Sequence, residues 1–253
     1  MLLFSTLARA LSHQSRTLLR MDSHADAAFI RSTIHEDEGL QTIQEDVERH
    51  LGGQGFDAGH DLAHSLRVAV WTLRLAPEVV PRDGIAAALL HDVINLPKDH
   101  PERSTASAQS ADYARQRLPA AGFGDEAVAC IAAAVEEHSY SRGLTPTSDL
   151  GRALQDADRL ETLGSIGLMR VFSTGTRMGA RYFHADDPWA EHRELDDLRF
   201  SIDHFATKLL GLPSTMNTEA GKREADRRAL RLRRFVVDLA DELAIEAPAW
   251  LGE

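Results

Sequence analysis

The sequence is poor in the residues that build covalent or thiolate-based sites. Only 6% of its 253 residues are aromatic, and Cys130 is the single cysteine. One thiol cannot form a disulfide framework or a thiolate metal site within one chain. Cys130 lies in the apolar run of residues 127–135, which favours a buried structural thiol over a nucleophile. This cysteine usage is typical of a reducing compartment, so we expect a cytoplasmic protein.

Long apolar runs and an excess of positive charge are also lacking. The run of residues 127–135 is the longest uninterrupted apolar stretch, well short of the roughly 18 residues that indicate a membrane span. The formal net charge of −11 opposes non-specific attraction to nucleic acid or to anionic membranes. We therefore expect a soluble protein without membrane or nucleic-acid partners, in which local positive charge attracts any phosphate-bearing ligand.

One basic stretch, residues 222–234, could indicate nucleic-acid binding. It is dense in arginine, but Glu224 and Asp226 dilute its charge and no aromatic platform accompanies it. The pattern instead predicts an amphipathic helix with a solvated basic face. We expect the opposite face, including Leu230, Phe235 and Leu239, to dock on the body of the protein.

The N-terminal twenty residues differ in composition from the rest of the chain. They contain three arginines, several hydroxyl side chains and no acid, which is typical of an organelle-targeting peptide or a loose basic tail. Met21 offers the alternative of an over-extended start. We expect residues 1–38 to form a mobile or non-native extension and residues 39–253 to form one domain.

From about Leu40 onward, apolar residues recur at intervals of three and four, which predicts helices and no strand. An apolar stripe through Leu62 and Leu73 predicts a helix that stops near Pro77. A second, centrally buried helix should begin after Pro81, with Asp83 as its N-cap. Further predicted helices cover residues 106–118, 125–138, 196–210 and 219–243, together with one that is capped by Ser148 or Asp149. The fold class is therefore all-α.

The strongest functional signal is the dipeptide His91-Asp92 at the polar end of that apolar helix. Burying an imidazole beside a carboxylate costs several kcal/mol unless both are paired, hydrogen-bonded or bound to metal. Alone, the dipeptide fits a structural pair as well as a site. Two other segments repeat the arrangement, because His64 lies in the first apolar helix and Asp158 in the helix after Pro146.

This ordered set of motifs resembles the HD superfamily of metal-dependent phosphohydrolases over roughly residues 59–243. Residues 59–68 (GHDLAHSLRV) resemble its first motif, residues 89–92 (LLHD) its second and residues 156–160 (DADRL) its third. Residues 95–103 and 203–210 are similar to a subgroup of small bacterial predicted HD hydrolases. The resemblance implies a single helical HD-type domain that hydrolyses a phosphate ester or anhydride.

The resemblance implies metal ligands at His64, His91, Asp92 and Asp158. Two neutral imidazoles and two carboxylates suit one divalent ion such as Mn²⁺, Mg²⁺, Fe²⁺, Ni²⁺ or Zn²⁺. Their two negative charges formally cancel the charge of the ion, so the site does not repel a phosphate. Such an ion activates water and polarises a phosphoryl group, and Asp92 could also align that water.

Two choices among neighbouring ligands have to be made. Asp156 and Asp158 point in nearly opposite directions on a helix, so only one can face the metal. The motif of the family selects Asp158, which leaves Asp156 as a cap or an outer hydrogen-bond partner. His60 and His64 have the i,i+4 spacing of a zinc pair, and this alternative stays open.

Phosphate binding requires cations near the ligands. Lys98 and Arg103, on the loop after His91-Asp92, are the candidate catalytic clamps for a phosphate. Arg67 and Arg159 are further candidates for binding substrate. Each of these four could equally be a surface charge or part of a structural ion pair. His138 ends a helix and is a candidate for orienting water or substrate.

The resemblance points to a small phosphorylated substrate, most simply a nucleotide. An alternative within enzymes is a two-metal HD phosphodiesterase or oxygenase that uses His100 and His138 as extra ligands. An alternative outside enzymes is a metal-stabilised nucleotide sensor without turnover. The residues by themselves identify neither the base, nor the sugar, nor the bond that is cut.

Overall fold

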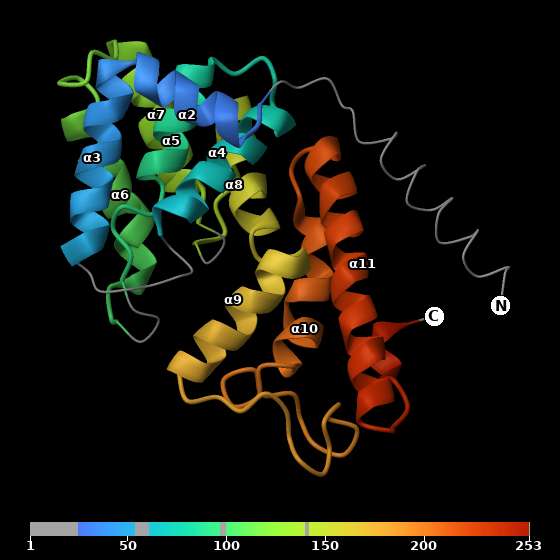
Figure 1. Cartoon of the computed structure of the whole chain (residues 1–253). Helices are drawn as coiled ribbons and strands as arrows, with labels where there is room; N and C mark the ends of the chain where they lie inside the picture. Colours follow the sequence, from blue (N-terminus) through green and yellow to red (C-terminus); the bar gives the residue numbers. More distant parts are fainter. Residues whose placement is uncertain (1–24, 54–60, 97–99, 140–141, 253) are drawn as a thin grey trace, which may run out of the picture.

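The computed structural model describes residues 25–53, 61–96, 100–139 and 142–252 (Figure 1). Its helices are α2 (Ala27–Glu36), α3 (Glu38–Gly53), α4 (Leu62–Leu75), α5 (Pro81–Leu90), η1 (Arg103–Thr105), α6 (Ala106–Arg117), α7 (Asp125–Glu137), α8 (Asp149–Leu160), α9 (Gly164–Arg177), α10 (Asp203–Thr207), η3 (Leu209–Thr215), α11 (Glu219–Glu242) and η4 (Ala249–Leu251). Across these described ranges extended pairing is confined to an isolated bridge between Arg181 and Phe200. The all-α prediction is confirmed.

Helix α5 is the centre of the core. Its residues from Gly84 to Leu90 are all buried, and it packs against α3, α4, α7 and α8. The helix begins at Pro81, with Val80 as its N-cap, so the predicted cap at Asp83 is wrong. Proline at the first helical position has a preset φ and needs no N–H partner, which lets the helix start earlier. A helix that is apolar on all sides must be enclosed, and this enclosure buries its C-terminal end.

Helices α4 and α8 flank α5 and begin at side-chain caps. The Asp61 carboxylate accepts the backbone N–H of His64 at 2.8 Å at the start of α4, and α4 ends at Leu75, before Pro77. At the start of α8, Ser148 Oγ accepts the N–H of Gly151 at 3.0 Å. Each cap satisfies an N–H group that has no partner within its helix. The caps set where α4 and α8 begin. The packing of the two helices against each other sets their relative position.

The N-terminal boundary differs from the predicted one at residue 38. Residues 27–36 form α2, capped by Asp26, and Ile30 and Ile34 of this helix are buried in the core. The basic composition of the first twenty residues does not continue into this segment, where Ile30 and Ile34 follow helical spacing. Residues 1–24 lie outside the described residues.

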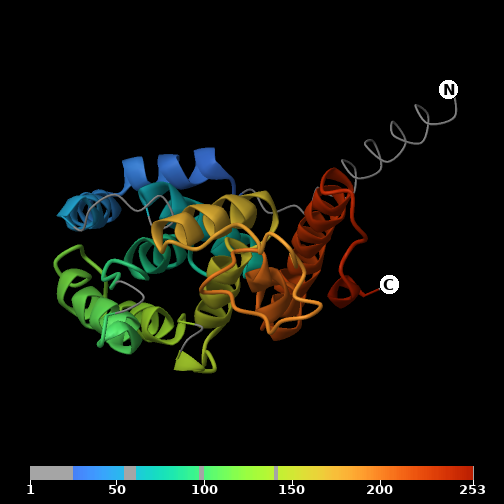
Figure 2. The same cartoon turned by 90° about the horizontal axis from the view of Figure 1, so that it is seen from below.

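The C-terminal part, α9 to α11, stands beside the α4–α8 bundle (Figures 1 and 2). The predicted helix over residues 196–210 is wrong, because only Asp203–Thr207 is α-helical. The buried Asp203 carboxylate accepts the Asp196 N–H at 2.7 Å and pairs with Arg193 at 2.6 Å, which holds residues 193–196 in a non-helical segment.

Helix α11 is amphipathic as predicted, with one exception. Phe235 and Leu239 pack on the core, whereas the side chain of Leu230 is 65% exposed. Leu230 stands two positions after Arg228, which occupies the buried face, so at about 100° per residue it points away from the body. Among the described residues, none of the helices is both long and apolar enough to span a membrane.

Candidate metal centre

Three helices place four potential ligands at one point of the core. His64 lies in the first turn of α4, His91 and Asp92 directly follow α5, and Asp158 lies in the last turn of α8. One ligand atom from each of these side chains lies within 4.8 Å of all the others. Among the described residues, this is the group of histidine and acidic side chains that could hold a metal ion. The four side chains come together because α4 packs against both α5 and α8.

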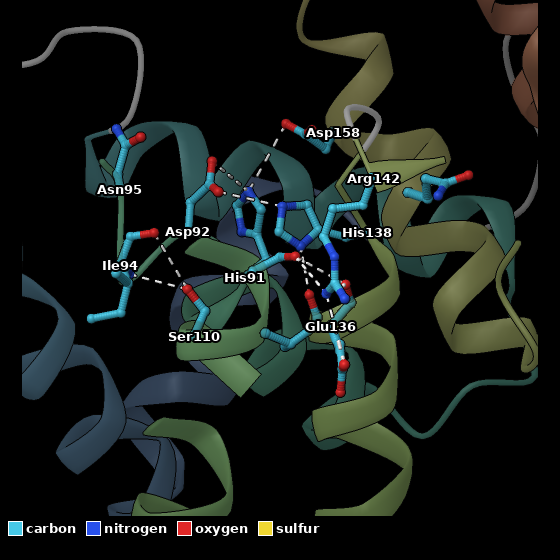
Figure 3. A network of polar contacts seen from close by, with 12 residues as sticks. His91, Asp92, Ile94, Asn95, Ser110, Glu136, His138, Arg142 and Asp158 are labelled. Carbon is cyan, nitrogen blue, oxygen red and sulfur yellow. Dashed lines mark hydrogen bonds and ion pairs between the residues drawn. The ribbon is translucent and has the colours of Figure 1, made fainter. Parts of the chain in front are cut away.

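The contacts within this group join its two imidazoles to its two carboxylates. His64 Nε2 lies 3.2 Å from His91 Nε2 and 3.5 Å from Asp158 Oδ1. His91 Nε2 lies 3.5 Å from Asp92 Oδ2 and 3.9 Å from Asp158 Oδ1. Figure 3 shows His91 between the two carboxylates. Both rings are buried, whereas the side chains of Asp92 and Asp158 are 22% and 23% exposed, so the centre opens to solvent on its carboxylate side.

The protonation state of His91 suits metal binding. Its Nδ1–H donates to the Ala88 carbonyl oxygen at 2.8 Å, which leaves the lone pair on Nε2. Burial lowers the pKa of His91 to about 4, so the ring is neutral at pH 7. Nε2 and the carboxylate oxygens near it are then all hydrogen-bond acceptors. A cation bound between them would stabilise this arrangement. The four side chains therefore fit a divalent ion, since neutral imidazole and carboxylate are both common ligands.

Asp158 carries its charge at neutral pH. Burial acts to raise the pKa of this carboxyl, but the positive charge of His91 at the acid pH where the carboxyl titrates outweighs it and holds the pKa below its usual value. An ionised carboxylate is the form that binds metal. Asp158 and His91 are thus both in their ligating forms without any change of protonation.

Glu161, which the sequence analysis did not single out, lies behind His64. His64 Nδ1 is 3.5 Å from Glu161 Oε2 and 3.0 Å from Arg170 Nη1, so α8 and α9 both hold the ring from the side opposite Nε2. Burial would raise the pKa of Glu161, but its hydrogen bond to His64 and the nearby Arg67 lower it. Glu161 follows Asp158 by three residues, and this spacing along one helix face was the available signal.

Arg67 and Arg103 make contacts that differ from the predicted phosphate binding. Arg67 Nε donates to Oε2 of the buried Glu161 at 2.7 Å, although the side chain of Arg67 is itself 36% exposed. Arg103 Nη1 donates to Asn95 Oδ1 at 2.6 Å and to the Leu96 carbonyl oxygen, and so joins the two ends of its own loop. Both side chains serve to hold local structure. The predicted Lys98, and His60 of the alternative histidine pair, lie outside the described residues.

His138 stands next to the centre, as Figure 3 shows. Its Nε2 lies 3.3 Å from Asp92 Oδ1, and its Nδ1–H donates to the Val135 carbonyl oxygen at 2.7 Å. Burial would lower the pKa of His138, but the hydrogen bond to Asp92 and the charge of that carboxylate raise it. His100, the other ligand of the two-metal alternative, accepts the N–H of Glu102 at 3.1 Å within its own turn.

Asp156 has a different partner from Asp158. Its carboxylate accepts the backbone N–H groups of Asn217 and Thr218, both at 2.8 Å, together with the Asn217 side-chain amide and the Thr218 hydroxyl. These contacts fix the start of α11. The predicted role of Asp156 as a cap or hydrogen-bond partner agrees with this placement. Arg159, the remaining predicted cation, donates to the Thr215 carbonyl oxygen just before α11.

Comparisons with known proteins agree with this geometry. Residues 61–163, which contain α4 to α8 and all four potential ligands, match the HD domain family. The chain is 28% identical over 192 residues to the uncharacterized protein YpgQ of Bacillus subtilis, a match that covers 74% of this chain and 85% of YpgQ. The crystal structure of YpgQ in complex with ADP superposes with a TM-score of 0.61 at 24% identity, over 80% of this chain and 97% of that one.

Two further solved structures share the fold at somewhat higher identity. A Lactobacillus plantarum protein has a TM-score of 0.62 at 28% identity and covers 81% of this chain and 97% of its own. An HD-superfamily hydrolase from Bacillus thuringiensis has a TM-score of 0.59 at 27% identity and covers 82% of this chain and 100% of its own. Residues 61–163 thus match the HD domain family, and the chain as a whole is similar to YpgQ and to solved structures of HD-superfamily hydrolases.

Proposed function

We propose that this protein is a metal-dependent phosphohydrolase that acts on a nucleotide. The observation that carries the proposal is the convergence of four ligand atoms, from His64, His91, Asp92 and Asp158, within 4.8 Å. His91 is neutral and Asp158 is ionised, as metal ligands must be, and the centre is accessible on its carboxylate side. A non-catalytic structural cluster would have no need of that opening.

One divalent ion, held by these four side chains, would supply a bound water of lowered pKa and polarise the phosphoryl oxygen. Asp92 has two tasks in this proposal, because its Oδ2 faces His91 and its Oδ1 faces His138. It would both hold the ion and accept a hydrogen bond from the attacking water. His138 would hold a proton on Nε2 beside Asp92 and donate it to the leaving oxygen. The hydrogen bond to Asp92 and the charge of that carboxylate raise the pKa of His138, which favours the protonated ring that this step needs.

The nucleotide part of the proposal is supported by the relatives. YpgQ has been crystallised in complex with ADP, and the match to it covers 74% of this chain. The net charge of −11 requires positive side chains at the site. The candidates are Lys98 and Arg103 on the loop after Asp92, and Arg67 and Arg159 beside the ligands. Arg67 and Arg103 would have to exchange their present contacts for a phosphate.

The test is a panel of nucleoside mono-, di- and triphosphates, incubated with the purified protein and Mn²⁺. We expect release of phosphate or pyrophosphate from at least one member and loss of this activity in His91→Ala. His35→Ala is the matched control, because His35 is exposed at the end of α2. Equal turnover by the wild type and His91→Ala would rule out the centre. Thermal stabilisation by nucleotide without any product would instead identify a sensor.

A further inference from the structure

Arg170 contacts the candidate metal centre from outside the segment that matches the HD domain family. It lies on α9, beyond residues 61–163, and its side chain is half-buried. Its Nη1 lies 3.0 Å from Nδ1 of the buried His64. The contact therefore joins α9 to the ring whose Nε2 faces the other potential ligands.

This contact determines which nitrogen of His64 carries the hydrogen. A guanidinium group has N–H donors and no acceptor, so Arg170 donates and Nδ1 of His64 accepts with its lone pair. A neutral imidazole has only one N–H group, which must then be on Nε2. A metal ion at Nε2 needs the lone pair of that same nitrogen. For a neutral ring, the hydrogen bond from Arg170 and metal ligation by His64 exclude each other.

The contact between His64 and His91 fits either of these two arrangements. Nδ1–H of His91 donates to the Ala88 carbonyl oxygen at 2.8 Å, so Nε2 of His91 holds a lone pair. Nε2 of His64 lies only 3.2 Å from it. Two lone pairs at this distance repel each other unless a hydrogen or a cation lies between them. The hydrogen of His64 serves while Arg170 holds Nδ1, and a metal ion takes its place when His64 is a ligand.

Glu161 supplies the partner that the ligating form of His64 requires. With an ion at Nε2, the hydrogen of the ring is on Nδ1 and needs an acceptor, which is the usual arrangement behind a metal-bound histidine. Glu161 is buried, and its Oε2 lies 3.5 Å from Nδ1. Arg67 donates to the same oxygen at 2.7 Å and holds it in place. Nδ1 of His64 thus has one neighbour that can only donate and one ionised neighbour that can only accept.

We propose that Arg170 and Glu161 are alternative partners of His64, and that metal binding exchanges Arg170 for Glu161. One proton leaves Nε2 and one binds at Nδ1, so the ring stays neutral throughout. Arg170 is a positioning residue that acts through His64, because it favours the form of the ring that does not bind metal. The inference rests on the metal centre of the proposed function and deepens it, since it names a residue of α9 that opposes metal binding.

The experiment locates the hydrogen of His64 by ¹⁵N NMR of the full chain labelled with ¹⁵N-histidine. Imidazole nitrogens with and without a hydrogen have different chemical shifts, and His64→Gln identifies the signals of this ring. We expect the hydrogen on Nε2 in EDTA and on Nδ1 with Zn²⁺, a diamagnetic ion. A hydrogen on Nδ1 in EDTA, or on Nε2 with Zn²⁺, would overturn the proposal. This comparison needs only the wild-type fold.

Arg170→Met removes the donor and separates this role from a merely structural one. We expect the hydrogen to move to Nδ1 in EDTA and the Zn²⁺ affinity to rise about 3- to 10-fold in calorimetry, because a competing hydrogen bond is lost. Arg170→Lys keeps a cation that can only donate, so it should restore the hydrogen on Nε2. A residue that merely supports the site would lower the affinity when removed. Unchanged or lower affinity in Arg170→Met contradicts the proposal.

Arg177→Met is the matched control, because Arg177 is an exposed arginine of the same helix. It removes the same charge and should leave the Zn²⁺ affinity within about 2-fold and the hydrogen on Nε2 in EDTA. An equal gain of affinity in both variants would reveal an effect of net charge and overturn the proposal. If the wild type does not bind Zn²⁺, the metal centre fails together with this inference. If it binds Zn²⁺ but the hydrogen of His64 does not move, only this inference fails.

Discussion

The two faces of helix α8 use the same residue type for different purposes. Asp158 faces His64 and His91 across the candidate metal centre, whereas Asp156 faces the start of α11. The two carboxylates are only two positions apart, but this spacing corresponds to about 200° around a helix. One face therefore holds a charge that lacks enough protein donors, and the other face holds a charge that is fully hydrogen-bonded.

This difference gives a general way to recognise a ligand. The four hydrogen bonds to Asp156 come from two residues at the N-terminus of a helix, where N–H groups lack intrahelical partners. Asp158 lies next to two imidazoles, and one of them, His91, presents a lone pair to it. A carboxylate in such surroundings needs a cation, whereas the Asp156 carboxylate is already satisfied. The comparison predicts opposite consequences for two otherwise identical substitutions.

The largest expected effect is that of Asp158→Asn on metal binding. The substitution removes a ligand and its charge, so Mn²⁺ affinity should fall more than about 100-fold, beyond the 10- to 100-fold typical of residues behind a ligand. The metal-free protein should lose only a little stability, because the surroundings of Asp158 favour its charged form but its side chain is 23% exposed. Calorimetric titration with Mn²⁺ and urea unfolding in EDTA measure the two quantities. Unchanged metal affinity would break the comparison.

The reverse is expected for Asp156→Asn. The amide keeps one acceptor oxygen but loses the charge that strengthens four hydrogen bonds, so the free energy of unfolding should fall by about 3 kcal/mol. Metal affinity of the folded fraction should stay within about 2-fold of the wild type. The same two titrations provide the measurement. A variant of normal stability would show that α11 does not depend on this cap.

The main parts of this arrangement could be predicted from the sequence because they depend on local rules. Helical spacing, Pro77 and the apolar run before His91 indicate α4 and α5, and a buried imidazole needs a reason to be there. Helical rotation showed that Asp156 and Asp158 cannot share a partner. It did not show which of them faces the centre, and the family motif made that choice.

The cations were less predictable, because a long flexible side chain can reach several partners. Arg67 was expected at a phosphate, but Glu161, far away in the sequence, accepts its hydrogen bond. The predicted N-cap at Asp83 failed for a different reason. The backbone geometry of Pro81 set the start of α5 ahead of the capping preference of Asp83.

The third expected effect is a dependence of stability on pH that comes from His91 at the metal centre. The pKa of His91 is about 4 in the folded protein, against 6.5 as the ordinary value. Between these values the unfolded chain binds a proton that the folded chain does not, so stability falls as pH decreases. For metal-free protein this amounts to about 3 kcal/mol between pH 6.5 and 4. His91→Gln should lack this component, and urea unfolding at both pH values tests the difference. Equal acid sensitivity of wild type and variant would contradict it.

The smallest effect extends the metal-side face of α8 by one turn, to Glu161. The Glu161 carboxylate lies 3.5 Å from Nδ1 of His64 and, together with Arg170, fixes the ring with Nε2 toward the other ligands. Glu161→Gln should therefore lower Mn²⁺ affinity about 10- to 100-fold, less than Asp158→Asn. Asp46→Asn is the control, since Asp46 is also buried and paired with arginines but lies between α3 and α6. It should lower stability without changing metal affinity. If both variants weaken Mn²⁺ binding equally, the effect is one of general stability, and Glu161 has no special relation to His64.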